Sequence, residues 1–428
     1  MTKAGAENVL WSESEKIAFR FIFILFSLFI VFYNNGAYPL FRFLIYYPTL
    51  VLNKLLIWVS KNILQLGYEL SVQPNGSGDT SYGYILLLFI SVVSLVGCLI
   101  WTLLDRKQLN YQKLYYWLTV AVRFYLGLML IQYGMVKVIK LQFPFPSLYR
   151  LSSTYGESTP MGLAWTFLGF STGYNLFMGI AELMGFLLLF RRTLVLGAII
   201  AVMTTANVMA VNYFYDVPVK ILSTALFLMS IYLLVPNAQR LYGFFISGEA
   251  VQLRDINPPA FRKQWLAKAK PAIKLIIVFV PTLFAFLMLI TQHGLYSSAK
   301  KLPLYGIYKV SSFNWQKDTA QNSVYALEWN SLIIETEGRC SIRFIDGTRD
   351  FCDLSIDTVK KQILLTFKDD VKAIHEFSYT TPVTISDHEN LNLSGTLFGN
   401  PVIIKLRKQK LPLMETGFNW VNEVPNNR

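Results

Sequence analysis

Residues 175–190, NLFMGIAELMGFLLLF, read as a membrane-spanning helix with one exception. The exception is Glu182, a carboxylate with apolar residues and glycines on both sides. A charged side chain at the centre of a bilayer costs about 2.5–3.5 kcal/mol or more unless it is paired or neutralised. The partner of Glu182 is therefore the first question that this sequence raises.

The composition places much of the chain in a membrane. Of its 428 residues, 54% are hydrophobic and 15% are charged, whereas soluble domains carry about 25% charged residues. The net charge is +13, yet residues 295–428 hold 16 Lys and Arg against 15 Asp and Glu. The excess positive charge thus lies in the apolar part, where it indicates cytoplasmic loops. No basic cluster alternates with aromatic residues, so we expect no nucleic-acid partner.

Hydropathy predicts seven membrane spans, at residues 17–33, 84–104, 115–136, 174–190, 194–211, 219–235 and 272–290. Starting inside, the cytoplasmic tail and loops hold 14 Lys and Arg when Arg20 near the start of the first span is included. The outer loops hold 7 when Lys220 at the start of its span is included. This bias predicts a multi-pass protein of a bacterial inner membrane with a cytoplasmic N-terminus and a periplasmic C-terminal domain. We expect no cleaved signal peptide, so the first span serves as an anchor.

The predicted fold class is a polytopic α-helical membrane protein of about seven transmembrane helices with a C-terminal, mostly β, extracytoplasmic domain. Alternating apolar runs and the hairpin signal Asp346-Gly347 indicate the β domain. The predicted domains are residues 1–113 with the first two spans, 114–235 with a four-helix membrane core, 236–294 with a basic cytoplasmic loop and the last helix, and 295–428 with the β-rich domain.

Segment 38–64 is a second apolar stretch within the first of these domains. It carries Lys54 and Lys61 on one helical face opposite a Leu/Ile/Trp face. This pattern fits an amphipathic helix in the membrane interface better than a crossing helix. A crossing helix remains the alternative, and it would place the N-terminus outside.

Arg123 is the predicted partner of Glu182. Each lies eight residues from the cytoplasmic end of its span, about 12 Å at 1.5 Å per residue, on adjacent antiparallel helices. Small residues allow membrane helices to approach closely. Gly127 and Gly134 lie on the same helical stripe as Arg123 and Lys137. Gly179 lies on the same helical face as Glu182. The pair either fixes helix register or forms a proton-relay or ligand site, and a protonated Glu182 facing lipid is the third alternative.

A second polar cluster is expected nearer the outside, formed by Gln132, Asn207, Asn212, Asp216 and Lys220. Its first interpretation is interfacial capping beside an aromatic belt. Its second is an outward-opening cavity that leads down to Arg123 and Glu182.

Cys340 and Cys352 flank the Asp346-Gly347 turn almost symmetrically, so they should lie opposite each other on adjacent strands. Outside the cytoplasm this arrangement favours a structural disulfide, and the absence of CxxC spacing disfavours a redox-active pair. No metal site is predicted, because Asp387-His388-Glu389 has the look of an exposed polar loop without further ligands.

RFYLGLMLIQYGMVK and GIAELMGFLLLF contain an Arg, two Gly and a Lys in one helix and a Glu before glycine in another. In these residues, Arg123, Gly127, Gly134, Lys137 and Glu182, the chain resembles the DoxX family of bacterial membrane proteins over about residues 114–235. Met184-Gly185 stands where that family often has a glycine pair. The resemblance implies a membrane subunit associated with quinone-linked sulfur oxidation or with thiol-stress complexes.

The leading hypothesis is therefore a membrane subunit of a redox complex, with a quinone-like or other hydrophobic ligand near Arg123 and Glu182. Lys137 and Asn207 would contact the polar groups of this ligand. Its β domain would recruit a periplasmic or membrane protein partner, and its helices would contact bilayer lipid. The alternative is a scaffold or assembly protein without turnover, whose charge pair is architectural. A transporter ranks third, because no repeated half with broken helices is visible.

Overall fold

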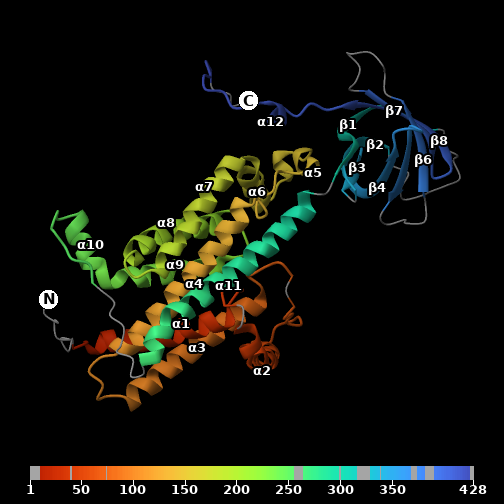
Figure 1. The fold of residues 1–428 in the computed structure, drawn as a ribbon. Coiled ribbons are helices and arrows are strands. Elements are labelled where there is room, and N and C mark those ends of the chain that lie inside the picture. The colour runs from red at the N-terminus through yellow and green to blue at the C-terminus, as the bar shows by residue number, and fades with distance from the viewer. Residues whose placement is uncertain are drawn as a thin grey trace. The chain divides into compact units, whose positions relative to one another are not determined.

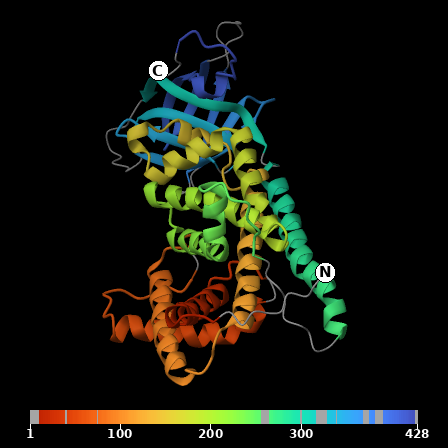
Figure 2. The same cartoon turned by 90° about the vertical axis from the view of Figure 1, so that its left-hand side faces the viewer.

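The computed structural model describes residues 10–38, 41–73, 75–254, 264–297, 300–315, 328–337, 339–367, 374–380 and 390–424. The chain divides into two compact units (Figures 1 and 2). The helical unit comprises Met1–Pro144 and Thr159–Thr291, and the β unit comprises Phe145–Ser158 and Gln292–Arg428. Residues 145–158 thus fold with the β unit, although they connect two helices of the helical unit.

The helical unit follows the apolar runs of the sequence closely. Its long helices are α1 (Glu13–Phe32), α2 (Phe41–Asn62), α3 (Ser81–Leu104), α4 (Gln112–Val138), α7 (Thr172–Leu183), α8 (Leu194–Phe214), α9 (Lys220–Leu234) and α11 (Gln264–Ser297). Shorter helices are α6 (Pro160–Phe170), the 3₁₀ helices η2 (Met184–Leu189) and η3 (Val235–Asn237), and α10 (Ala238–Phe245).

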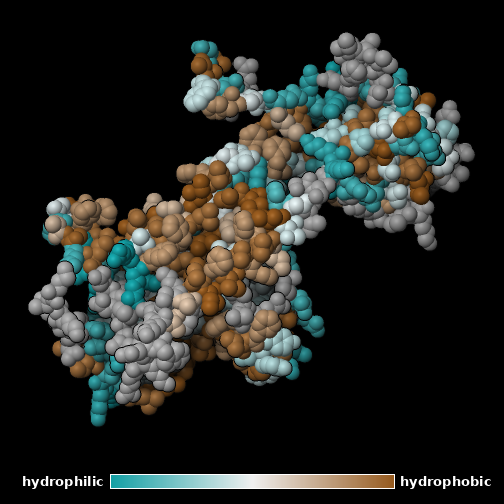
Figure 3. All heavy atoms as spheres, viewed as in Figure 1, coloured by the Kyte–Doolittle hydropathy of each residue, from teal (hydrophilic) through white to brown (hydrophobic). Residues whose placement is uncertain are grey.

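Six helical segments are long and apolar enough to cross a membrane: Phe43–Asn62, Ser81–Leu104, Gln112–Val138, Thr172–Leu189, Leu194–Phe214 and Lys220–Phe245. Their outer surfaces carry many exposed large hydrophobic side chains, and Figure 3 shows hydrophobic residues gathered over this part of the molecule. Such an apolar surface suits lipid contact. This agrees with a helical membrane part. The predicted set of seven spans differs, because the six segments include Phe43–Asn62 and lack the predicted spans 17–33 and 272–290, of which the second overlaps the shorter apolar helix Val278–Gly294.

α4 is the central helix of the unit. Side chains on several of its faces are buried, and they form one core with apolar residues of α1, α8 and α9. On another face α4 packs against α7 and η2 through glycines. A Cβ on Gly134 would lie 2.8 Å from the Gly179 carbonyl oxygen, and one on Gly185 would lie 2.6 Å from Leu130 Cβ. The expected glycine contacts therefore bring these two helices close together.

α2 runs in a different direction from its neighbours. Figure 1 looks nearly along its axis, while α3 and α11 run across the picture. Leu52 and Leu56 of α2 pack against Ile85 and Ile90 in the first half of α3, and Trp58 is exposed. This orientation suits the expected interfacial helix, although α2 is also long and apolar enough to cross.

The β unit is a closed antiparallel barrel of eight strands in sequence order. The strands are β1 (Lys301–Trp315), β2 (Trp329–Thr336), β3 (Cys340–Phe344), β4 (Arg349–Asp357), β5 (Gln362–Phe367), β6 (Ile374–Thr380), β7 (Asn390–Leu397) and β8 (Asn400–Lys408). Pairing of β1 with β8 closes the sheet, which leaves no exposed sheet edge. A short helix, α12 (Pro412–Glu415), follows the barrel.

The hairpin predicted at Asp346-Gly347 is present between β3 and β4. Gly347 has φ +87°, a conformation that glycine adopts without strain, and Asp346 Oδ1 accepts a hydrogen bond from the Thr348 backbone N–H at 2.9 Å. The barrel interior is filled by apolar side chains, including Trp329, Phe367 and Phe377. The β unit is therefore a packed barrel, which agrees with the predicted mostly β domain.

Residues 145–158 lie against this barrel through α5 (Leu148–Leu151) and η1 (Tyr155–Glu157). Leu148 packs with Ile307 and Ile333 in a small apolar cluster. The Leu148 backbone N–H donates to Glu335 Oε1 at 3.0 Å.

Candidate functional site

Glu182 forms a buried ion pair with Lys137. The Lys137 ammonium lies 2.7 Å from both carboxylate oxygens, and the two residues are 5% and 3% exposed. Two aromatic rings flank the ammonium, with the Tyr133 and Phe143 ring centroids 5.6 and 5.8 Å from Nζ. Salt bridging and aromatic contacts thus compensate the cost of burying both charges.

The expected pair of Arg123 with Glu182 is wrong. Arg123 is buried, but its Nη2 donates instead to the Leu189 backbone carbonyl at 3.2 Å. Lys137, which the sequence predicts to contact a ligand, pairs with Glu182 in place of Arg123.

The direction of helical side chains explains this correction. Cα–Cβ bonds lean toward the N-terminus of their own helix, and α4 and α7 are antiparallel. The Arg123 side chain therefore extends toward the N-terminus of α4. The Glu182 side chain extends toward the N-terminus of α7, which lies beside the C-terminal end of α4. Lys137, near that end of α4, points back along its own helix and reaches Glu182. In addition, the 3₁₀ segment η2 rises about 2.0 Å per residue rather than 1.5 Å, which moves Glu182 further from Arg123 than a count of residues suggests.

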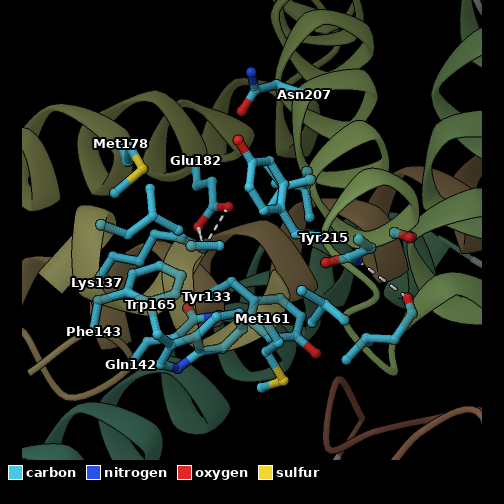
Figure 4. Close-up of a pocket in the computed structure, with 18 of the residues that line it drawn as sticks. Tyr133, Lys137, Gln142, Phe143, Met161, Trp165, Met178, Glu182, Asn207 and Tyr215 are labelled. Atoms are coloured by element: carbon cyan, nitrogen blue, oxygen red, sulfur yellow. Dashed lines mark hydrogen bonds and ion pairs between the residues drawn. The ribbon is translucent and has the colours of Figure 1, made fainter. Parts of the chain in front are cut away.

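The Lys137–Glu182 pair lies on the wall of a pocket of about 400 Å³ within the helical unit (Figure 4). Most of the wall is apolar and aromatic, and it includes Trp165, Met161 and Met178. Asn207 of α8 lines the same pocket. A small number of polar groups in a mainly apolar cavity of this size is typical of sites for small hydrophobic ligands.

The pocket extends from Glu182 to the loops at one end of the bundle. Gly76 lies in the loop before α3, and Tyr215 and Pro218 lie in the loop between α8 and α9; all three line the pocket. The Gly78 backbone N–H donates to the Pro218 carbonyl at 2.8 Å, and Asp79 accepts hydrogen bonds from the first two backbone N–H groups of α9. These contacts hold the two loops together beside the pocket.

The predicted outer polar cluster divides into three parts. Asn207 and Asn212 line the pocket, and Asn212 Nδ2 donates to the Val219 carbonyl at 3.3 Å. Asp216 and Lys220 pair with each other at 2.8 Å. Gln132 lies elsewhere and donates to the Gly36 carbonyl at 3.1 Å. The cavity interpretation thus fits the two asparagines, and Arg123 is not among the lining residues.

Several lining residues have no signal in the sequence. Trp165 lies on α6, a helix that hydropathy did not separate from its loop, and Gln142 follows α4 in a segment without periodicity. Gln142 Oε1 is buried and lacks a hydrogen-bond partner in the described structure. Asp79 is one of few acids in the first hundred residues, which is the only hint of its capping role.

Cys340 and Cys352 face each other directly across β3 and β4, as their spacing predicts. Both are buried in the barrel, and burial raises the pKa of the Cys340 thiol. Redox-active cysteines have lowered pKa values, so the site favours a structural role. In the part of the chain that the structure describes, no disulfide joins Cys340 and Cys352, and the bond stays a prediction.

No cluster of three His, Cys, Asp or Glu suited to a metal ion occurs in the described residues. Asp387-His388-Glu389 lies outside them.

Comparison with known families finds no family model that matches the chain, and no solved structure matches it. A stretch of 133 residues is 35% identical to the uncharacterised protein YwoB of Bacillus subtilis (strain 168), covering 79% of that protein and 29% of this chain. The chain belongs to the YwoB family. YwoB is itself uncharacterised, so membership of this family assigns no activity to the chain.

Proposed function

We propose that the helical unit spans a membrane and binds a neutral hydrophobic ligand of the quinone class beside Lys137 and Glu182, as a membrane subunit of a redox complex. The observation that carries this proposal is the buried ion pair on the wall of the apolar pocket. The quinone class is our inference from the sequence resemblance to the DoxX family, and no family model matches the chain.

The charges of the site select the kind of ligand. Lys137 and Glu182 neutralise each other, so an anionic ligand would have to compete with Glu182 for the ammonium. An ammonium has three N–H donors, and two of them serve the carboxylate oxygens. The third donor is available to a ligand carbonyl, and the amide of Asn207, which lines the same pocket, offers a second polar contact. A ring with carbonyl groups and an apolar tail fits this distribution.

Trp165 provides a direct test because it lines the pocket. Titration of the purified chain with a short-chain quinone analogue should quench tryptophan fluorescence, and the Trp165→Phe variant should lose most of that quenching. The double variant Lys137→Met with Glu182→Leu keeps the volume but removes the polar groups, and it should bind at least about tenfold more weakly. Asp216→Asn is the matched control outside the pocket. Equal affinity in the double variant and the control would refute the proposal.

One observation favours the alternative, a scaffold with an architectural pair: each carboxylate oxygen of Glu182 is already bonded to Lys137. Exchange of the two residues, Lys137→Glu with Glu182→Lys, separates the alternatives. A scaffold should keep its thermal stability and its assembly after the exchange, whereas a ligand site should lose quinone affinity.

The topology that we propose has a cytoplasmic N-terminus and a periplasmic β unit. Residues 145–158 follow α4 and fold with the β unit, and the barrel itself follows α11. The C-terminal ends of α4 and α11 therefore belong on one side of the membrane, as the predicted spans require. Labelling of single cysteines at exposed Glu157 and Arg192 in spheroplasts tests this: a membrane-impermeant maleimide should label only the first.

A further inference from the structure

Arg123 is a buried cation without a counter-ion in the described structure. It is 5% exposed, its Nε is buried without a hydrogen-bond partner, and none of the ion pairs among the described residues includes it. Its one hydrogen bond goes to the neutral Leu189 carbonyl. A charge in this state is expensive at membrane depth, so something outside the described residues is expected to balance it.

A second arginine lies beside it. Arg191 follows by two residues Leu189, whose carbonyl accepts the hydrogen bond from Arg123. Arg191 Nη2 donates to the Tyr116 hydroxyl at 2.5 Å, and its guanidinium lies 5.5 Å from the Tyr116 ring centroid. Each of the two arginines thus donates its hydrogen bond to a neutral group near the end of η2.

The sequence supplies few acids that might neutralise them. Residues 114–235 contain three carboxylates, Glu157, Glu182 and Asp216, and each is engaged elsewhere. Residues 264–297, the α11 segment that packs against this side of α4, contain none. Among the described residues, no carboxylate thus balances these two arginines.

We propose that Arg123, Arg191 and the Tyr116 hydroxyl bind the phosphate of an anionic phospholipid. Arginine guanidinium groups match phosphate geometry, and basic pockets between membrane helices at the cytoplasmic side bind anionic headgroups. Trp117 is exposed next to Tyr116, as expected for a helix surface at the level of lipid headgroups. This site lies apart from the pocket of Lys137 and Glu182, because none of its three residues lines that pocket.

The full chain, purified and stripped of lipid, is tested by native mass spectrometry and thermal melting with phosphatidylglycerol, phosphatidylcholine or inorganic phosphate. Phosphatidylglycerol should bind and raise the melting temperature more than phosphatidylcholine. Arg191→Gln changes an exposed residue and should fold, yet it should weaken phosphatidylglycerol binding about fivefold. Arg240→Gln, an exposed arginine on the same predicted side, is the matched control and should bind as the unchanged protein does.

Arg123→Met adds a test that does not depend on the exposed charge. It should lose the preference for phosphatidylglycerol over phosphatidylcholine, and it should melt in phosphatidylcholine at least as high as the unchanged protein, because no unpaired charge remains. Equal effects of Arg191→Gln and Arg240→Gln would overturn the site. Stabilisation by inorganic phosphate as large as that by phosphatidylglycerol would overturn its assignment to lipid.

Discussion

Loss of either Lys137 or Glu182 alone should lower the free energy of unfolding more than loss of both residues together. Removing one partner from a buried ion pair leaves an uncompensated charge and costs about 3–5 kcal/mol, whereas replacing both by apolar residues is often neutral. Glu182→Gln should therefore lower the thermal stability of the purified protein strongly, and Lys137→Met in the same chain should restore most of it. If the double variant is less stable than Glu182→Gln alone, the pair is not a self-contained unit.

Cys340 and Cys352 permit a second test at the scale of residues. Their facing register predicts a disulfide in protein isolated from an oxidising compartment, and a bond that closes so short a loop contributes about 2–4 kcal/mol. Alkylation of the unfolded, unreduced chain should label Cys98 alone, and a reductant should lower the melting temperature of the barrel. Labelling of all three cysteines would contradict the disulfide.

The sequence identifies Glu182 as exceptional and places Lys137 among the candidate site residues, but it pairs Glu182 with Arg123 instead of Lys137. The depth of a residue along a membrane helix can be counted from the sequence. Its ion-pair partner also depends on the direction in which the side chain extends from the helix. Applying the N-terminal lean of helical side chains to two antiparallel helices would have favoured Lys137. The 3₁₀ geometry of η2 has no comparable signal in a run such as MGFLLL.

Helices α4 and α7 approach each other through Gly134 and Gly179, and this approach holds the ion pair in place. A Cβ on Gly134 would lie 2.9 Å from the Leu183 backbone nitrogen. Because this neighbour is a backbone atom, α4 and α7 would have to move apart to accommodate a larger side chain. Gly134→Ala should cost about 1–3 kcal/mol and weaken ligand binding in the pocket. Gly173→Ala in the first turn of α7 is the control, because nothing lies closer than 3.8 Å to its added Cβ. Equal melting temperatures for the two variants would show that the glycine contact is not tight.

Long elements are predictable here because burial in lipid requires long apolar runs, and the helix bounds follow these runs within a few residues for α3, α8 and α9. β1 is a different case. Its segment KLPLYGIYKVSSFNW contains Pro303 and Gly306, which normally interrupt strands, and a register shift lies between Lys301 and Gly306. Its role in closing the barrel depends on pairing with β8, almost a hundred residues later, which local pattern does not encode.

In the molecule as a whole, Glu157 ties residues 145–158 to the barrel. Its carboxylate pairs with Arg343 and lies 3.6 Å from Arg349 Nη2. The backbone N–H of Thr154 and then Arg343 hold the pKa of Glu157 below its usual 4.5. A lowered folded-state pKa means that the contribution is present above the unfolded pKa and is lost as pH falls through the folded value.

Hydrogen exchange of residues 145–158, corrected for its intrinsic pH dependence, should therefore lose protection as the pH falls below about 4.5. In Glu157→Gln, protection should be lower at neutral pH and change little across the same range. A variant that follows the pH profile of the unchanged protein would assign the transition to other carboxylates, such as Asp346 in the β3–β4 turn.

The attachment of Leu148 to Glu335 also imposes an order on biosynthesis. The two contacting residues are 187 positions apart, and a ribosome adding about 5–20 residues per second needs about 10–40 s to cover that distance. The short segment after α4 must therefore wait, on the far side of the bilayer under the proposed topology, until translation and export deliver its binding surface. During that interval Leu148 and Leu151 lack their barrel contacts and are accessible to a chaperone or a protease at the membrane. Slow export of the barrel should therefore make residues 145–158 the first site of cleavage in the chain.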